Sequence, residues 1–248
     1  MAQIDELTIV GGSPTSKVGT KGYIRNYQGH IDSTSSYQVQ LAKPGGPLLP
    51  SADGPACASF QQKLDFNPNP LFPQLTAAPG DFIQGTYSDN GHVSLPPTPE
   101  SESGIAYWYG SANGSTVPPL SEVIKWTKDG KGGDGNGRLL AGPDNYDDGV
   151  CAEGNGSPIA QQRHAPPGPG ILCKNSFSLP EDLPDGSTYT VYWVWDFSLH
   201  FGPKFKAEKG HVEWYTSCAD IKISRGAGAG ADPKAPPGRR ARRRALRV

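Results

Sequence analysis

Short segments in which apolar and polar side chains alternate recur along the chain, and this period of two predicts strands rather than helices. The longest such segment is residues 187–197, STYTVYWVWDF. Its odd-numbered residues from 189 to 195 share one face, its even-numbered residues from 190 to 196 share the other, and both faces are largely apolar. The pattern therefore predicts a central strand covered on both sides, with Trp193 and Trp195 in the core.

Other segments with strand-like composition are shorter and are separated by turn signals such as Pro79-Gly80 and Asn90-Gly91. We expect further strands at residues 5–10, 22–27, 81–87, 104–110 and 211–223. Residues 43–80 and 128–149 are expected to be mostly loop, and residues 121–130 either one helical turn or a strand. An amphipathic helix of useful length is not predicted anywhere in the sequence.

This combination predicts an all-β fold, an antiparallel β-sandwich of immunoglobulin- or fibronectin-like type with long Gly/Pro-rich loops. Glycine and proline make up 57 of the 248 residues, but 23 aromatic residues argue against a disordered chain. We expect one domain over residues 1–224. Residues 225–248 are low in complexity and are expected to form a disordered basic Gly/Ala/Arg-rich tail.

The charge is unevenly distributed, because the tail is basic and the body is mildly acidic. Residues 226–248 carry seven basic residues and one acidic residue, so a chain with a net charge of −1 has a body at −7. A body of this charge argues against a nucleic-acid partner. The arginines at 239–244 could form a nuclear signal or an anion-binding tail, or they could belong to an unstructured extension.

The four cysteines, Cys57, Cys151, Cys173 and Cys218, form no C-x-x-C pair, which argues against a zinc site. An even number in a loop-rich chain indicates two disulfides and an extracellular protein, with three pairings open. Sequons at Asn113 and Asn155 agree with secretion. The chain has no long apolar run that predicts a membrane span, and its start, MAQIDELTIV, has no signal-peptide pattern. We therefore expect that the native precursor starts elsewhere.

The candidate chemistry lies at His92, one of only five histidines, which follows the Asn90-Gly91 turn at the exit of a predicted strand. On the last predicted strand, Glu213 and Tyr215 share a face, and Cys218 could anchor that strand by a disulfide to Cys57. The histidine and the tyrosine could therefore converge. The alternatives are a loop histidine, a core tyrosine and an exposed glutamate.

Other residues carry weaker signals. His211 alternates with the pair on the last strand and could join it, whereas His30, His164 and His200 are expected in loops. At least one aromatic residue of 107–109 is expected to be exposed and able to stack on sugar. The segment GKGGDG, residues 130–135, lacks the strand and helix of a dinucleotide-binding fingerprint. The segment DNYDDGVCAEGN, residues 144–155, is only faintly similar to a calcium loop, because two ligand positions are wrong.

The terminal stretch EWYTSCADI resembles the last strand of fungal copper-dependent lytic polysaccharide monooxygenases. Across residues 4–223 the chain also resembles an uncharacterised family of secreted fungal proteins that are regarded as monooxygenase-like. The stretches that carry this resemblance, in order, are GYIRNY, PGDFIQGTYSDNGHVSLP, YWYG, DGKGGDGNGRLLA, DDGVCAEGNGSPIAQQR, YTVYWVWDF and EWYTSCADI.

The resemblance implies a copper ion held by the amino group and imidazole of an N-terminal histidine and by a second histidine, a nitrogen set that suits Cu(II). His92 would be the second histidine, Tyr215 the axial group, and Glu213 a catalytic partner that orients the oxygen species. Such a protein is an extracellular monomer that attacks a polysaccharide such as chitin or cellulose. It has neither a nucleic acid nor a membrane as partner.

The sequence departs from this pattern at its start, because Met1 occupies about the position of the N-terminal histidine. Methionine supplies no imidazole, so the chain as written cannot complete the copper site. Either the native mature protein begins with a histidine that this version lacks, or the protein is a non-catalytic relative that binds carbohydrate or copper. A metal-free secreted protein that interacts with a host is a third alternative.

Overall fold

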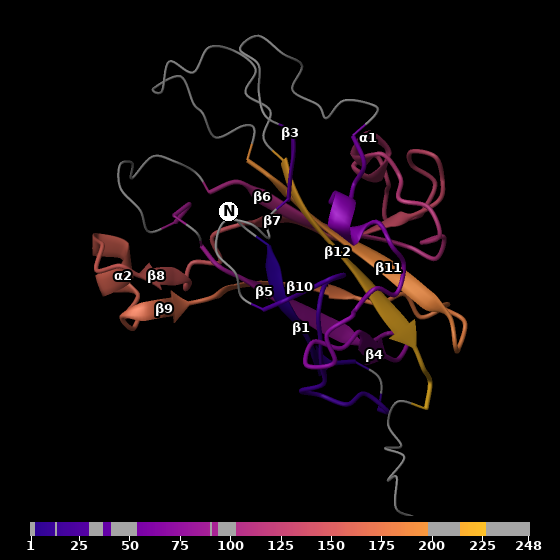
Figure 1. Ribbon diagram of the computed structural model, residues 1–248, viewed down its shortest axis with the longest axis horizontal. Helices are drawn as coiled ribbons and strands as arrows, with labels where there is room; N and C mark the ends of the chain where they lie inside the picture. The colour runs from indigo at the N-terminus through magenta and orange to yellow at the C-terminus, as the bar shows by residue number, and fades with distance from the viewer. Residues whose placement is uncertain are drawn as a thin grey trace, which may run out of the picture.

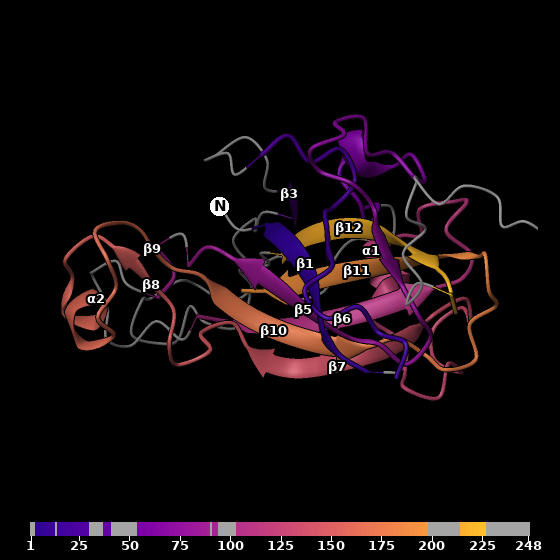
Figure 2. The same cartoon turned by 90° about the horizontal axis from the view of Figure 1, so that it is seen from below.

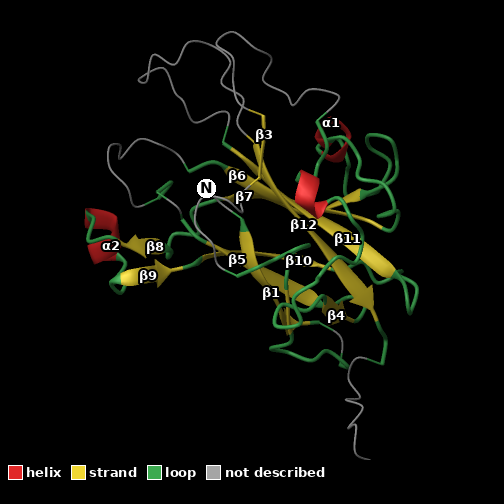
Figure 3. Ribbon diagram, in the orientation of Figure 1, coloured by secondary structure: helices red, strands yellow, loops and turns green. Residues whose placement is uncertain are grey.

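The computed structural model describes residues 3–12, 14–29, 37–40, 54–89, 91–93, 103–197 and 214–226, with only the backbone described for 37–40. Strands dominate these residues, and helices are confined to single turns (Figure 1, Figure 3). The predicted all-β sandwich is therefore confirmed. Among the described residues, no helix is both long and apolar enough to span a membrane. The tail from residue 227 onward lies outside the described part, so its predicted disorder stays a prediction.

The first sheet has four antiparallel strands in the order β10-β5-β1-β2. These strands are β1 (Ile4–Gly11), β2 (Lys21–Gly22), β5 (Phe82–Tyr87) and β10 (Cys173–Ser178). Register shifts flank the middle of β1, between Ile4 and Glu6 and again between Ile9 and Gly11. The first shift lets both Ile4 and Leu7 point into the core although they are three residues apart.

The second sheet follows the order β3-β12-β11-β6-β7, and β4 pairs with β12 in parallel. Its strands are β3 (Tyr37–Gln40), β4 (Leu75–Ala77), β6 (Ile105–Ser111), β7 (Arg138–Asn145), β11 (Thr188–Asp196) and β12 (Trp214–Ile223). The sheet is thus antiparallel except for the β4 pairing. In Figure 2 the strands β1, β5 and β10 of the first sheet overlie the strands β12, β11, β6 and β7 of the second sheet, which lie side by side in sheet order.

The main core lies between the two sheets. Strand β11 contributes Trp193 and Trp195, both fully buried, and they pack with residues of β1, β5, β10 and β12. Trp108 of β6 also points inward, where its ring lies against Gly85 so closely that a Cβ there would come within 2.5 Å of it. A glycine in the middle of β5 therefore makes room for an indole from the opposite sheet.

A second, smaller core covers the outer face of the same sheet. The even-numbered residues Tyr192 and Val194 of β11 pack there with the turn α1 (Leu120–Val123) and with Trp126. The prediction of a central strand covered on both faces is confirmed. The short 3-10 helix η1 (Ser59–Gln61) lies in the loop segment that leads toward β4.

Two predicted segments were assigned wrongly. The strand expected at residues 22–27 ends at Gly22, because Asn26 adopts a left-handed conformation (φ 56°) and Arg25 points into the core. The loop expected at 128–149 contains the edge strand β7, whose half-exposed sequence RLLAGPDN lacks a clear alternation. The segment 121–130, left open between a helix turn and a strand, begins within the helical turn α1.

Arg25 and Asp220 form a fully buried, two-pronged ion pair beneath β12. Nε and Nη2 of Arg25 donate to the two carboxylate oxygens of Asp220, each at 2.7 Å. Asp220 also accepts from the Thr190 hydroxyl and from the Asp65 amide, both at 2.7 Å, while Arg25 donates to the Gln61 carbonyl oxygen at 3.0 Å. The pair thus ties the central strands to the loop of residues 59–66.

The cysteines pair as Cys57–Cys218 and Cys151–Cys173, so one of the three open pairings is observed. The first disulfide is the one that the sequence suggested for the last strand, and it joins β12 to the loop before η1. The second disulfide closes a segment that contains β8 (Ala152–Gly154), α2 (Pro158–Gln162) and β9 (Gly168–Ile171). This segment projects from one end of the sandwich in both ribbon views (Figure 1, Figure 2).

Replacing Arg25 with methionine should lower the free energy of unfolding by about 3–5 kcal/mol, because it leaves the Asp220 carboxylate buried without its cation. Urea denaturation would measure the loss. The control is Lys125→Met, which breaks an exposed ion pair with Glu122 and should change stability by less than about 1 kcal/mol. Equal losses in the two variants would contradict the role assigned to the buried pair.

Candidate functional site

Strand ends from both sheets meet at one end of the sandwich. In the first sheet, Ile4 at the start of β1 pairs with Tyr87 at the end of β5. In the second sheet, Asp196 at the end of β11 pairs with Trp214 at the start of β12. The Ile4 amide donates a hydrogen bond to the Ser217 hydroxyl at 3.1 Å, which joins the two sheets at this end. The start of β1 and the start of β12 are therefore neighbours.

His92 lies at this end because of the turn that follows β5. Oδ1 of Asp89 accepts from the Gly91 amide at 2.7 Å, Oδ2 accepts from the Glu153 amide at 2.9 Å, and the Asp89 carbonyl accepts from the His92 amide at 2.9 Å. Asp89 is buried. Gly91 adopts a left-handed conformation (φ 79°), which glycine reaches without strain. A buried carboxylate therefore fixes the turn against β8.

The imidazole of His92 is half-buried in an aromatic corner. Its ring meets Trp195 and Phe197 nearly edge-on, with centroids 4.7 and 4.6 Å away. Tyr146 and Tyr215 lie farther off, each with its ring centroid at 6.5 Å. These contacts hold the ring in place and leave part of it open to solvent. The ring contacts fit a packed loop histidine as well as a metal ligand, so both alternatives for His92 stay open.

Tyr215 is buried near the start of β12 and stacks on Trp195, with centroids 4.6 Å apart and planes 24° apart. Trp195 stacks in turn on Tyr146 at 4.1 Å and donates its Nε1–H to the Ser103 carbonyl at 2.8 Å. Tyr215 is thus both a packed core residue and a neighbour of His92. A role in the core and a place beside His92, the two alternatives that the sequence left for Tyr215, are therefore compatible.

Tyr146 completes the corner, and sequence reasoning did not assign it to the site. Its hydroxyl donates to the Ser88 carbonyl at 2.6 Å, and the Tyr87 hydroxyl donates to the Tyr146 carbonyl at 2.8 Å. Burial raises the pKa of both phenols far above the ordinary value, so both stay neutral. Burial also raises the pKa of Glu153, and the neighbouring Asp89 carboxylate raises it further.

Gln3 precedes β1 at the same end of the sandwich. Its side chain is buried, and neither its carboxamide oxygen nor its nitrogen has a hydrogen-bond partner in the structure. A buried polar group without a partner is unfavourable by about 1–3 kcal/mol. The Gln3 carboxamide, just before β1, would therefore be stabilised by a polar partner.

Several predicted site residues lie outside the described residues, namely Glu213, His30, His200 and His211. Their positions remain predictions. His164 is described, and it lies exposed just after α2 with a left-handed backbone (φ 55°). Of the aromatic residues at 107–109, Tyr107 is half-buried and the other two are buried, so only Tyr107 keeps a partly open ring.

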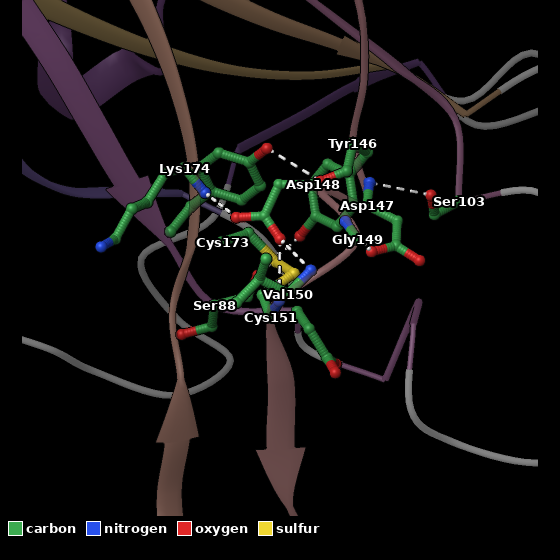
Figure 4. Close-up of a disulfide and its surroundings, with 12 residues drawn as sticks. Ser88, Ser103, Tyr146, Asp147, Asp148, Gly149, Val150, Cys151, Cys173 and Lys174 are labelled. Atoms are coloured by element: carbon green, nitrogen blue, oxygen red, sulfur yellow. Dashed lines mark hydrogen bonds between the residues drawn. A yellow bond between two sulfur atoms is a disulfide. The ribbon is translucent and has the colours of Figure 1, made fainter. Parts of the chain in front are cut away.

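The segment with faint similarity to a calcium loop is occupied by other interactions (Figure 4). The Asp148 carboxylate accepts from the amides of Val150, Cys151 and Lys174 at 2.7–2.9 Å. Asp147 is paired with Arg163, with Nη1 and Oδ1 2.6 Å apart. The nearby Cys151 sulfur is in a disulfide. These groups secure the base of the projecting segment, and they do not form an open cation site.

A sequence-profile comparison matches residues 4–239 to the family described as Domain of unknown function (DUF7492). The chain belongs to this family. The match includes residues 4–223, over which the sequence resembles an uncharacterised secreted family. A comparison with curated proteins finds no match for this DUF7492 chain.

Solved structures with some similarity to this DUF7492 chain include three that are reported under the following titles. They are "CvAA9A" (15% identity, TM-score 0.40, covering 94% of this chain and 81% of that one), "Crystal Structure of a Cellulose-active Polysaccharide Monooxygenase from M. thermophila (MtPMO3*)" (16%, 0.34, 90% and 78%) and "Crystal structure of HiLPMO9B" (13%, 0.36, 96% and 82%). At these identities and TM-scores, no ligand or activity carries over to the DUF7492 chain.

Replacing Asp89 with alanine should lower the free energy of unfolding by about 1–3 kcal/mol, because the Gly91 and Glu153 amides both lose their acceptor. It should also release the His92 ring from Trp195, which proton NMR would detect as a loss of ring-current shifts. Urea denaturation with Asp129→Ala is the matched control, since the Asp129 carboxylate accepts bonds in an exposed loop. Asp89→Ala no less stable than this control would contradict the role of Asp89.

Proposed function

We propose that the end of the sandwich at His92 is a mononuclear copper site in an extracellular protein that oxidises polysaccharide. The observation that supports this most is the meeting of three elements at one place. His92 follows β5, Tyr215 lies near the start of β12, and β1 begins beside β12 through the bond between Ile4 and Ser217. A histidine ahead of β1 would therefore approach the same corner from the chain start.

The described residues fit copper in part. They supply one partly open imidazole and one phenol, and the two rings are near enough to approach the same metal ion. An imidazole is a preferred ligand of copper. The unpartnered Gln3 carboxamide shows that the polar environment just before β1 is incomplete. His92 would hold the ion, Tyr215 would stand at its side, and the remaining nitrogen ligands would come from a residue ahead of β1. Glu213 is proposed as the group that orients the oxygen species.

When bound, copper supplies one-electron chemistry that activates oxygen or peroxide. The chain's own residues position and shield the site. The rings of Trp195 and Phe197 hold the imidazole from its edge, and the buried Asp89 fixes the turn that carries it. Tyr146 and Tyr87 remain neutral because of burial, so they add no charge behind the imidazole.

The extracellular location and the polysaccharide partner rest on other features. Two disulfides are typical of proteins that fold in an oxidising compartment. The substrate class, such as chitin or cellulose, follows from the sequence resemblance. We propose a monomer for the same reason.

To test this, the Met1→His variant would be expressed with a cleavable leader. Removal of the leader leaves the introduced histidine with a free amino group. This form should bind one Cu(II) tightly and give an electron paramagnetic resonance spectrum of a tetragonal, nitrogen-rich site. Adding His92→Ala should abolish tight binding and leave the fold intact, because the stack of Tyr215, Trp195 and Tyr146 holds together without the imidazole. Calorimetry and the spectrum would measure both effects.

The matched control in the same background is His164→Asn, which removes an exposed histidine and keeps a residue that tolerates its left-handed backbone. Its copper affinity should not change. Equal affinity with and without His92 would overturn the site. Tight copper binding without oxidised sugar products from chitin or cellulose would instead favour the non-catalytic binding protein.

A further inference from the structure

A half-open cavity of about 210 Å³ lies at the other end of the sandwich from His92. It is bounded by the end of β6, the glycine-rich loop before β7, the turn at 182–184 and the start of β11. Its walls include Gly110, Ala112, Asn136, Arg138, Asp182 and Tyr189. All of these residues belong to the described part of the chain, and none of them takes part in the proposed copper site.

The hydroxyl of Tyr189 is the least satisfied group of this cavity. The residue is only 2% exposed, and its hydroxyl has no hydrogen-bond partner in the structure. A Cβ on Gly110, which also lines the cavity, would lie 2.6 Å from that hydroxyl. Tyr189 thus lines the cavity with a phenol whose buried hydroxyl has no partner. Burial raises its pKa far above the ordinary value, so the hydroxyl keeps its proton.

The cavity is also lined by an exposed ion pair, Arg138 with Asp182, whose hydrogen bonds are long. Nη1 and Nη2 of Arg138 lie 3.5 and 3.3 Å from the carboxylate oxygens of Asp182, and the side chains are 39% and 68% exposed. Exposed pairs of this kind contribute little to stability, so they can exchange partners at small cost. A ligand would therefore find both a fork of donors and a pair of acceptors beside the buried hydroxyl.

The backbone of the glycine-rich loop is largely committed to its own turns. The amides of Gly130 and Gly135 donate to the carbonyls of Thr127 and Gly132 at 3.0 and 3.2 Å, and the Asn136 amide donates to the Asp134 carboxylate at 3.0 Å. Few free amides remain for an anion, and Asp182 would repel one. An apolar ligand would leave the phenol unpaired. The chemistry that remains is neutral and rich in hydroxyl groups.

We propose that this cavity binds a neutral polyhydroxyl ligand of about the size of one sugar ring. A hydroxyl of the ligand would pair with Tyr189, and adjacent hydroxyls would donate to Asp182 and accept from Arg138. The volume is below the roughly 300–1,000 Å³ of pockets for drug-sized molecules, which suits a single ring. The proposal is independent of copper, because it needs no residue from the His92 end.

The test is titration of the full chain with D-glucose, N-acetyl-D-glucosamine, glycerol and inorganic phosphate, each followed by amide NMR. The Gly110, Gly135 and Asn136 amide signals should shift with at least one sugar, and those around His92 should not. Tyr189→Phe removes only the unpaired hydroxyl and should weaken that binding by about two- to tenfold, the range for one hydrogen bond. The fold should persist, since the variant removes a buried group that has no partner.

A second variant and a control keep the result clear. Ala112→Leu extends an exposed wall residue into the cavity and should abolish the shifts without disturbing the core. Tyr107→Phe removes a hydroxyl that does not line the cavity and should leave binding unchanged. The proposal would be overturned if neither sugar shifts these amides. No shift with any probe would indicate a water site, and a shift with glycerol or phosphate alone would exclude a sugar ring as the ligand. Unchanged affinity in Tyr189→Phe would overturn the role of the phenol.

Discussion

The buried pair of Arg25 with Asp220 is the interaction on which the arrangement of the sandwich depends. A charge removed from water is tolerated only when its partners are complete, and these two residues complete each other with help from Thr190 and the Asp65 amide. These hydrogen bonds join four segments that are far apart in sequence, at residues 25, 65, 190 and 220. The Cys57–Cys218 disulfide adds a covalent tie two residues before Asp220 on the same strand. Strand β12 is therefore held firmly, and with it Tyr215 near its start.

A firmly held β12 has consequences at the His92 end. The rings of Tyr215, Trp195 and Tyr146 form one continuous stack, and the imidazole leans on it from the edge. The turn that carries the imidazole is fixed by Asp89, which also receives the amide of Glu153 from the projecting segment. Each layer of the molecule thus contributes to one small region. The same strands at their opposite ends enclose the cavity at Tyr189, so the two candidate sites share a scaffold and no residues.

Local patterns predicted the central strands well, because β11 and β5 carry strong alternation and clear turns. The pairing of Cys57 with Cys218 and the nearness of His92 to Tyr215 were also foreseen as options. Other features depend on contacts between distant residues. Nothing near Arg25 shows that it turns inward to meet a partner 195 residues away. The edge strand β7 lacks alternation because it is half-exposed, and Tyr146 joins the aromatic corner only through the tertiary fold.

In the function that we propose, the corner at His92 holds copper together with a residue ahead of β1. The most direct test is the N-terminal sequence and intact mass of the protein as its native host secretes it. We expect a mature chain that begins with histidine shortly before the segment DELTIV, with a mass that reflects two disulfides. A mature chain that begins with Met1, or with any residue other than histidine, would contradict the copper site and favour a non-catalytic binding protein.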